Sequence, residues 1–197
     1  MDDEAKVATA TAAFTNTKLS QELYDWIEII VYSLSVVLLI FMFLFRQVSV
    51  GGISMENTLN AGVINEDQFI DRVLVYECNY VPRRGDIVVL TTKAVKTSII
   101  KRVIAVGGDT VDINFDKHTV SVNGKVLNEP YIKEPTASRG DVKFPVTVPK
   151  GDVFVMGDNR NVALDSRYAA IGMVNNNNIM GKAILRFFPL NEIKILR

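Results

Sequence analysis

The sequence has very little cysteine or histidine. Its 197 residues include a single Cys and a single His. One cysteine excludes an intramolecular disulfide framework and a cysteine-rich zinc site, and one histidine leaves no histidine pair to hold a metal. Net charge is also absent, since 22 Lys and Arg residues balance 22 Asp and Glu residues. A globally basic nucleic-acid-binding protein is therefore excluded.

Apolar residues are concentrated near one end of the chain. The mean hydropathy of +0.18 is high for a soluble domain, and the excess lies in the run WIEIIVYSLSVVLLIFMFLF at 26–45. No charged residue occurs from Ile29 to Phe45. A helix of about 20 residues spans about 30 Å, the thickness of the hydrocarbon core of a bilayer. The run therefore predicts one transmembrane helix over residues 26–46.

The segment before this run argues against a cleaved secretory signal. A signal peptide has a basic start, a shorter apolar run and small residues at its cleavage site. Residues 1–28 instead contain more acids than bases. We therefore expect a retained anchor preceded by a tail over 1–25. Lys6 and Lys18 precede the span and Arg46 follows it, so the positive-inside rule favours, by a small margin, a cytoplasmic N-terminus.

The remaining residues, 47–197, have the pattern of a mostly β domain. Short runs rich in Val and Ile recur between Gly, Pro, Asn and Asp, as in strands separated by turns. Asn123 and Gly124 form a two-residue hairpin signal, because both tolerate a positive φ. The hairpin and several prolines mark 109–150 as a small β elaboration. Only the stretch 67–77 is ambiguous between helix and strand.

The first candidate site, Ser54, directly follows the anchor in the run GGISMENTL. The two glycines of this run allow close approach by the backbone of another chain. A serine beside glycines is more often a turn residue than a nucleophile. The run alone therefore leaves both interpretations of Ser54 open.

The second candidate, Lys101, lies in the run SIIKRVIAVGGD. Side chains alternate between the two faces of a strand, so Lys101 shares a face with Ile99, Val103 and Ala105. Burial disfavours the charged ammonium and lowers the pKa of a lysine, and a neutral amine is what a lysine general base requires. The alternative is a lysine whose stem packs on the sheet while its ammonium reaches water.

The third candidate is a group of acids and arginines in GDNRNVALDSR. Two acids and two arginines within this run, together with one arginine from the preceding strand, predict a compact ion-pair network of Arg102, Asp158, Arg160, Asp165 and Arg167. The RGD run at 84–86 is a candidate to join it. The acid spacing fits no known calcium loop, so we expect no metal site.

These sites occur in an order that resembles the bacterial type I signal peptidases, which are membrane-bound Ser-Lys enzymes that remove signal peptides from exported preproteins. SMENTL is similar to the SMxPTL box of the family, and RGDIVV to its RGD box. KRVIAVGGD is similar to the lysine box, and GDNRNVALDSR to GDNRxxSxDSR. The resemblance covers the anchor and nearly all of 47–197. The single anchor resembles Gram-positive members.

The resemblance implies a function and a site. Ser54 would be the nucleophile and Lys101 the general base, with an acyl-enzyme intermediate and cleavage after small residues, as in Ala-x-Ala. The expected cleft walls are Met55, Leu59, Ile99 and Ile100. The implied fold is a membrane-anchored, signal-peptidase-like β domain, with the catalytic domain outside the cytoplasm. The implied partners are preprotein signal peptides, the lipid bilayer and, as a further candidate, the secretion translocon, without cofactor or nucleic acid.

Two residues depart from the family pattern. Asn57 stands where the pattern has Pro, and Ala163 stands where it has a Ser whose hydroxyl helps to orient the lysine amine. We expect a looser turn beside Ser54 and weaker positioning of Lys101. An alternative function follows, that of a catalytically weak or inactive paralogue acting as a membrane-tethered peptide-binding module.

Three other interpretations are disfavoured by the sequence. A self-cleaving Ser-Lys regulator of the repressor type would be soluble and carry a DNA-binding segment, whereas residues 1–50 form an anchor. The Ser-His form of signal peptidase would have His at position 101, where this chain has Lys. Cys78 lies in no matching box and has no neighbouring His, so we expect it to be a half-buried structural residue.

Overall fold

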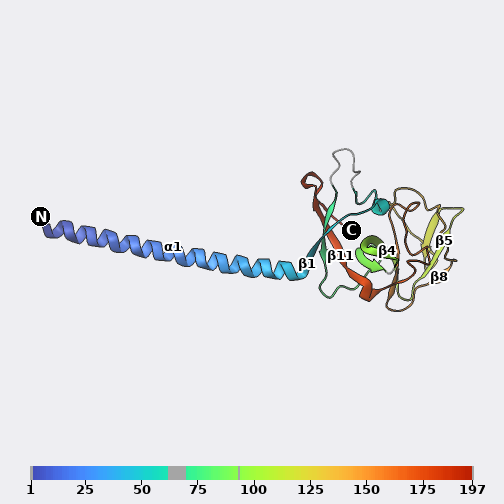
Figure 1. Ribbon diagram of the computed structural model, residues 1–197, viewed down its shortest axis with the longest axis horizontal. Helices are drawn as coiled ribbons and strands as arrows, with labels where there is room; N and C mark the ends of the chain where they lie inside the picture. The colour runs from blue at the N-terminus through green and yellow to red at the C-terminus, as the bar shows by residue number, and fades with distance from the viewer. Residues whose placement is uncertain (1, 62–69, 93, 197) are drawn as a thin grey trace. The chain divides into compact units, whose positions relative to one another are not determined.

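The computed structural model describes most of the chain. The described residues are 2–61, 70–92 and 94–196. They divide into two compact units, with the boundary between Leu44 and Phe45. The first unit is one helix and the second is made mostly of strands (Figure 1). The expected fold class, a mostly β domain preceded by one apolar helix, is therefore confirmed.

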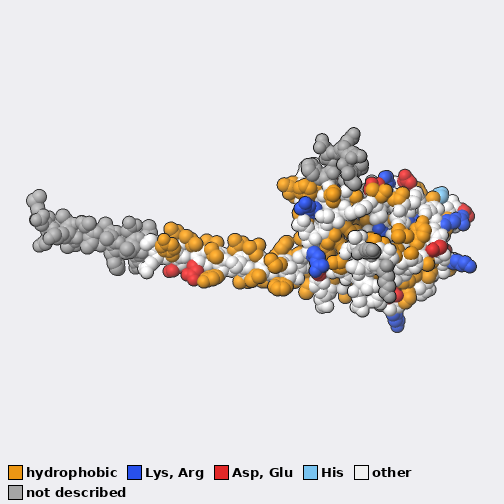
Figure 2. Space-filling model, in the orientation of Figure 1, with side chains coloured by type: hydrophobic (Ala, Val, Ile, Leu, Met, Phe, Trp, Pro, Cys, Tyr) orange, Lys and Arg blue, Asp and Glu red, His pale blue; other side chains and the backbone are white. Residues whose placement is uncertain are grey.

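The first unit is helix α1 (Asp2–Leu44). Its segment Ser20–Leu44 has a mean hydropathy of 2.6 and buries none of its most apolar window against the protein. Apolar side chains cover this described part of the helix in Figure 2. The segment is long and apolar enough to cross a membrane. The helix ends at Leu44 rather than Arg46, because Phe45 and Arg46 already pair with β2 as a strand.

A large antiparallel sheet forms the body of the second unit. It has eight strands in the order β1-β2-β11-β3-β4-β9-β10, and β12 pairs with β11. Its strands are β1 (Phe45–Ser49), β2 (Arg72–Tyr76), β3 (Ile87–Thr92), β4 (Val95–Val106), β9 (Asp152–Met156), β10 (Val174–Asn175), β11 (Ile179–Phe188) and β12 (Lys194–Ile195). Three short 3-10 helices join them: η1 (Ile53–Met55), η2 (Asn176–Asn178) and η3 (Leu190–Glu192).

A second, four-stranded sheet lies between β4 and β9 in the sequence. Its order is β7-β6-β5-β8, and its strands are β5 (Thr110–Asn114), β6 (Thr119–Val122), β7 (Lys125–Val126) and β8 (Val146–Thr147). The turn between β6 and β7 has φ values of 53° at Asn123 and 76° at Gly124. The expected Asn-Gly hairpin is confirmed, since both turn residues have the positive φ that such a turn requires.

Strand β4 contributes side chains to all three apolar clusters of the core. Ile99 and Val103 pack in one cluster, Ile100 in a second, and Ile104 with Ala105 in the third. The register of β4 against β9 shifts between Val103 and Ala105, and such a bulge breaks the regular alternation of faces. Our expectation that Ala105 shares a face with Lys101 and Val103 is therefore wrong.

The segment around β2 differs from expectation in one respect. Within the ambiguous stretch 67–77, residues 72–76 form strand β2, and residues 67–69 lie outside the described residues. Cys78 is exposed, so the half-buried position expected for it is wrong. It follows the end of β2 and precedes Asn79, whose φ of 48° turns the chain. Its side chain therefore lies on a turn rather than on a strand face.

Candidate active site

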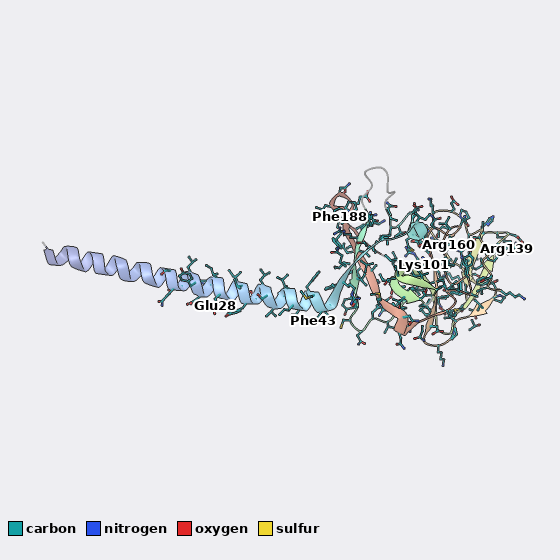
Figure 3. The ribbon with its side chains drawn as sticks, in the orientation of Figure 1. Glu28, Phe43, Lys101, Arg139, Arg160 and Phe188 are labelled. Carbon is teal, nitrogen blue, oxygen red and sulfur yellow. The ribbon has the colours of Figure 1, made fainter. Side chains whose placement is uncertain are left out.

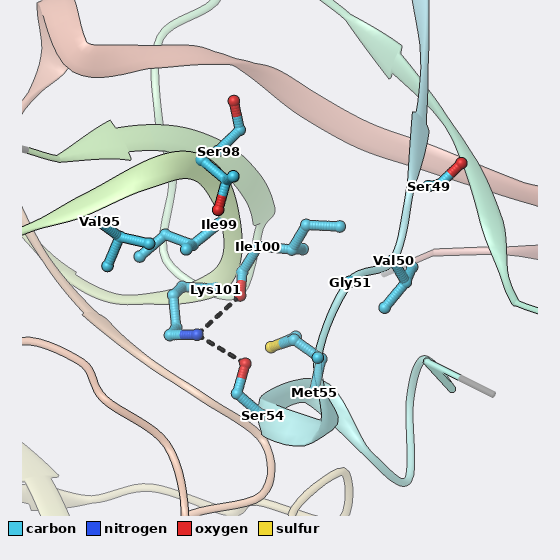
Figure 4. A pocket seen from close by; sticks show the side chains of 12 residues that line it. Ser49, Val50, Gly51, Ser54, Met55, Val95, Ser98, Ile99, Ile100 and Lys101 are labelled. Carbon is cyan, nitrogen blue, oxygen red and sulfur yellow. Dashed lines mark hydrogen bonds between the residues drawn. The ribbon is translucent and has the colours of Figure 1, made fainter. Parts of the chain in front are cut away.

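A cleft of about 400 Å³ lies between the end of β1 and the first half of β4 (Figure 4). Its lining comes from residues 49–55 and 95–101, and it includes both Ser54 and Lys101. The two stretches approach each other because the short helix η1, which follows β1, contacts β4. The sequence alone does not bring them together.

The cleft brings the two sequence-predicted reactive residues into contact. Lys101 Nζ lies 2.6 Å from Ser54 Oγ, although the residues are 47 positions apart in the chain. Lys101 Nζ also donates a hydrogen bond to the Ile100 carbonyl oxygen at 3.1 Å. Both contacts are drawn in Figure 4. A nucleophile within hydrogen-bonding distance of a candidate base is the arrangement that nucleophilic catalysis requires.

Burial changes the protonation of Lys101. The residue is 3% exposed, and it sits on β4 opposite Val88 of β3, which is fully buried. Loss of hydration lowers the pKa of Lys101 from 10.5 to about 8, although Asp165 and Asp158 act in the opposite direction. About a tenth of the amine is therefore neutral at pH 7, and about half of it at pH 8.

Ser54 is held by contacts with a distant loop. It lies in the short helix η1, which begins after Gly52. The Asn159 backbone N–H donates to the Ser54 carbonyl oxygen at 3.0 Å, and Asn159 Nδ2 donates to the Ile53 carbonyl oxygen at 3.1 Å. Asn159 therefore binds the carbonyl groups of both peptide bonds that flank the Ser54 Cα.

Gly157 allows this loop to approach the serine turn. A Cβ at position 157 would lie 2.5 Å from the Ser54 carbonyl oxygen and 2.4 Å from the Ala163 Cβ. Neither contact is sterically possible, so a larger residue would push the loop and the turn apart. Gly51 and Gly52 differ, because a Cβ at either would meet nothing within 4 Å. Those two glycines border open space in the cleft.

The expected network of acids and arginines lies near Lys101, because Asp165, Asp158 and Arg167 all act on the charge of its amine. Arg102 binds Asp158 through two hydrogen bonds of 2.8 Å, and Arg167 binds Asp165 at 2.9 Å. Arg102 is 2% exposed, and the other four members, Asp158, Arg160, Asp165 and Arg167, are fully buried. Buried charges need such partners, because an unpaired charge is costly in the protein interior.

The sequence analysis missed two members of this network. The Glu129 carboxylate accepts two hydrogen bonds from the Arg160 guanidinium, from Nη1 at 3.0 Å and from Nη2 at 2.6 Å. The Tyr131 ring lies 4.0 Å from the Arg102 guanidinium carbon, and 6.0 Å from that of Arg160. The sequence signal for them is the run EPYIKE, whose two acids and one aromatic do not indicate a partner about 30 positions away.

The RGD run contacts this network through its backbone. The Gly85 carbonyl oxygen accepts a hydrogen bond of 2.8 Å from Arg102. The Arg84 side chain pairs with Asp109, and Asp86 binds Lys182 at 2.6 Å. The run therefore ties the ends of β3 and β4 together, and its charged side chains pair outside the network.

Three of the four expected cleft walls line the cleft. Met55, Ile99 and Ile100 belong to the lining, together with Val95 and neighbouring residues that the sequence analysis did not include. Leu59 does not: it is fully buried and packs in the core cluster that includes Met55. The expectation for Leu59 is wrong, because the chain turns inward after η1 and points this side chain into the core.

Asn57 has a backbone conformation that the sequence analysis did not anticipate. Its φ is 83°, whereas the ring of proline holds φ near −65°. Proline could not adopt the backbone conformation found at position 57, and the expected loosening of the turn stays a prediction. Ala163, the second departure, is 3% exposed beside Gly157.

The chain matches known proteins along most of its length. A family model described as "Signal peptidase, peptidase S26" matches residues 23–188. "Signal peptidase I P" of Bacillus subtilis subsp. natto is 39% identical over 177 residues, covering 86% of this chain and 91% of that protein. "Signal peptidase I" of Bacillus licheniformis is 36% identical over 186 residues, covering 91% and 96%.

More distant relatives carry the same name. "Signal peptidase IB" of Staphylococcus aureus is 32% identical over 194 residues, covering 89% of this chain and 95% of that protein. A crystal structure of a signal peptidase I from Enterococcus faecalis is 30% identical, with a TM-score of 0.43, and covers 52% of this chain and 97% of that chain. The chain therefore belongs to the S26 family of signal peptidases, among its bacterial type I members of the Gram-positive kind.

Proposed function

We propose that this chain is a membrane-bound serine endopeptidase that removes signal peptides from exported preproteins, with Ser54 as nucleophile and Lys101 as general base. The observation that carries the proposal is the 2.6 Å distance between Lys101 Nζ and Ser54 Oγ at the edge of a cleft. The lowered pKa of Lys101 supports it, since a base must be neutral to accept a proton. Relatives named signal peptidase I support the substrate class.

The reaction proceeds in two stages. Neutral Lys101 accepts the Ser54 hydroxyl proton while Ser54 Oγ attacks the scissile carbonyl carbon. The tetrahedral intermediate collapses, the peptide C–N bond breaks, and the Lys101 ammonium returns the proton to the leaving amine. Water then attacks the acyl-enzyme while Lys101 accepts one of its protons. The ester C–O bond breaks, the Lys101 ammonium returns that proton to Ser54 Oγ, and the signal peptide leaves with a new carboxyl terminus.

The developing oxyanion needs hydrogen-bond donors that are already in place. The Ser54 backbone N–H is the first donor, because it lies in η1 beside the attacking oxygen. The N-cap of η1, Gly52, makes no side-chain hydrogen bond to the turn. The chain therefore offers a backbone donor at this position rather than a side-chain hydroxyl.

The substrate binds as an added strand. Strand β9 pairs with β4 from Arg102 to Val106, so within the described residues the first part of β4 is paired along one edge, by β3. An extended peptide can pair with such an edge. The backbone hydrogen bonds then hold peptides of varied sequence, and a few pockets select particular side chains. Met55, Val95 and Ile99 line these pockets. Their bulk restricts the pockets to small residues, as in Ala-x-Ala.

An apolar helix directly before the β domain supports a reaction at a membrane surface. In this proposal the apolar part of α1, within Ser20–Leu44, spans the membrane. The residues before it lie in the cytoplasm, and the peptidase domain 47–197, including the elaboration 109–150, lies outside it. Cleavage occurs where the apolar segment of a signal peptide ends, and β1 begins directly after the spanning helix. Binding to the secretion translocon would bring nascent substrates to the same surface.

Cleavage of a model preprotein by the detergent-solubilised full chain tests the proposal. We expect a product that ends after a small residue from the parent, background from Ser54→Ala, and a loss of about 10²–10⁴-fold from Lys101→Ala. Ser121→Ala and Lys125→Ala, in the hairpin of the second sheet, are the matched controls and should keep parental activity. Undiminished cleavage by Ser54→Ala would refute the proposed nucleophile.

The pH profile tests the role of Lys101 separately. Below its pKa of about 8 the amine is protonated and cannot accept the Ser54 proton. We therefore expect kcat/KM to rise about tenfold per pH unit on the acid side and to level off above about pH 8. A titration that places the pKa of Lys101 near 10 in the folded enzyme would refute its role as the general base. A parent that binds signal peptides without cleaving them would favour the membrane-tethered peptide-binding module.

A further inference from the structure

The turn that carries Ser54 continues into a residue with an unusual backbone conformation. Asn57 has a φ of 83° and is exposed. Residues other than glycine seldom adopt such a φ, although asparagine is among those that tolerate it. Proline cannot stiffen this backbone, so other contacts must hold the turn in place.

Those contacts converge on the carboxylate of Glu56, the residue before Asn57. Glu56 Oε2 accepts a hydrogen bond from Lys133 Nζ at 2.7 Å and another from Asn159 Nδ2 at 3.1 Å. Asn57 Nδ2 lies 3.5 Å from the Ile132 carbonyl oxygen, next to Lys133. Three segments that are distant in sequence therefore meet at the turn.

The two partners of Glu56 are themselves anchored. The Lys133 backbone N–H donates to the Asp158 carbonyl oxygen at 3.0 Å, and the Asp158 carboxylate is held by Arg102. Asn159 donates to the carbonyl groups of Ile53 and Ser54. The carboxylate of Glu56 thus lies between one anchored cation and the amide that holds both carbonyls at the serine.

We propose that Glu56 and Lys133 are positioning residues that hold the Ser54 turn in its reactive geometry through Asn159. The proposal rests on the function proposed above, in which Ser54 is the nucleophile. Glu56 orients the Asn159 amide, because Asn159 Nδ2 uses one hydrogen for Glu56 and the other for the Ile53 carbonyl. We call the Glu56–Lys133–Asn159 group the turn brace.

Exposure separates this role from a general contribution to stability. The side chain of Lys133 is 45% exposed and that of Glu56 is 24% exposed. Ion pairs of such exposure contribute little to folding stability. A misplacement of the nucleophile by about 1 Å, however, can cost about a hundredfold in rate. The turn brace should therefore affect kcat much more than the unfolding temperature.

Steady-state kinetics of the full chain on a model preprotein tests this inference. We expect Glu56→Ala to lower kcat by about tenfold, with KM, the unfolding temperature and the acid limb of the pH profile unchanged. KM should hold because Glu56 does not line the cleft. Glu56→Gln should lose less, because its amide oxygen still accepts from Asn159. The double variant Glu56→Ala/Lys133→Ala should be no slower than Glu56→Ala alone.

The exposed pair Arg139–Asp116 supplies a matched control. Its side chains are 70% and 91% exposed, and Arg139 lies well away from Lys101 (Figure 3), so Asp116→Ala should keep the parental kcat. A kcat within twofold of the parent in Glu56→Ala would overturn the inference, as would a fall that only follows loss of folded protein. Ser54→Ala is measured in the same series: activity there refutes the proposed nucleophile, whereas its absence beside a fully active Glu56→Ala refutes only the turn brace.

Discussion

The two members of the Ser54–Lys101 pair are held in different ways. Lys101 lies within a 12-residue strand and is 3% exposed, among residues of the core. Ser54 lies in a three-residue helix whose first residue, Ile53, and N-cap, Gly52, are both exposed. Sheet pairing and apolar packing therefore position the base, whereas polar contacts from distant loops position the nucleophile.

This difference separates two kinds of sensitivity. The environment of Lys101 depends on burial, which lowers the pKa of its amine. The position of Ser54 depends on hydrogen bonds from Asn159 and on the small size of Gly157. Substitutions at Lys101 should alter proton transfer and the pH dependence of the rate. Substitutions around Ser54 should alter the position of its hydroxyl. The variants below test this division, from the largest expected effect to the smallest.

Lys101→Met should have the largest effect on activity while making the fold more stable. We expect loss of the general base to lower kcat/KM by about 10²–10⁴-fold. The lowered pKa of Lys101, about 8 against 10.5 when unfolded, means that the unfolded chain binds more protons between these values. Stability of the parent therefore rises with pH across this window, and below pH 8 the buried amine costs about 3 kcal/mol.

Urea unfolding at several pH values checks the stability half of this prediction. Lys101→Met should be more stable than the parent at pH 7, and the gain should vanish towards pH 10.5. Lys125→Met, at an exposed position of the hairpin, should change neither activity nor stability. A Lys101→Met variant that is less stable at every pH would contradict burial as the cause of the lowered pKa.

Asp158→Ala should have the largest effect on folding. Asp158 is fully buried and binds Arg102 through both oxygens, and Thr58 Oγ1 donates to it at 2.5 Å. Removing one member of a buried ion pair leaves the other charge without compensation, which costs about 3–5 kcal/mol. The free energy of unfolding in urea measures this. Asp116→Ala, from an exposed pair, should be indistinguishable from the parent, and equal effects would contradict the prediction.

Asn57→Pro should reduce activity although it matches the pattern of the family. The φ of 83° at Asn57 is inaccessible to proline, so we expect the turn to shift and kcat to fall by about tenfold or more. Asn57→Gly, which tolerates this φ, should stay within about twofold of the parent. The kcat of both variants is the measurement. A proline variant as active as the glycine variant would show that the turn does not need this conformation.

Ala163→Ser should have the smallest effect, and in the opposite direction. Ala163 is buried beside Gly157, and the resemblance to the family implies that a hydroxyl there would give the Lys101 amine a further hydrogen-bond partner. One hydrogen bond is worth about 1 kcal/mol, or about fivefold in rate. We expect kcat to rise by up to about that factor, with Ala163→Gly as the control. A decrease would mean that the added oxygen crowds the loop.

Local patterns in the sequence predicted some of these features and not others. The apolar run predicted the helix, and Asn123-Gly124 predicted its hairpin, because both depend on residues that are neighbours in the chain. Leu59 was misplaced because its environment depends on the turn that follows η1. The bulge after Val103 was missed because register shifts arise from pairing between strands.

Sequence alone determined the apolar helix, the mostly β character of the second unit and the residue types available for chemistry. Only the tertiary structure decided that Lys101 meets Ser54, that Glu129 pairs with Arg160, and that Glu56 is shared between Lys133 and Asn159. The physical reason is that residue order controls local backbone preference and the face a side chain occupies. Contacts across tens of positions depend on how strands pair and loops pack once the whole core has formed.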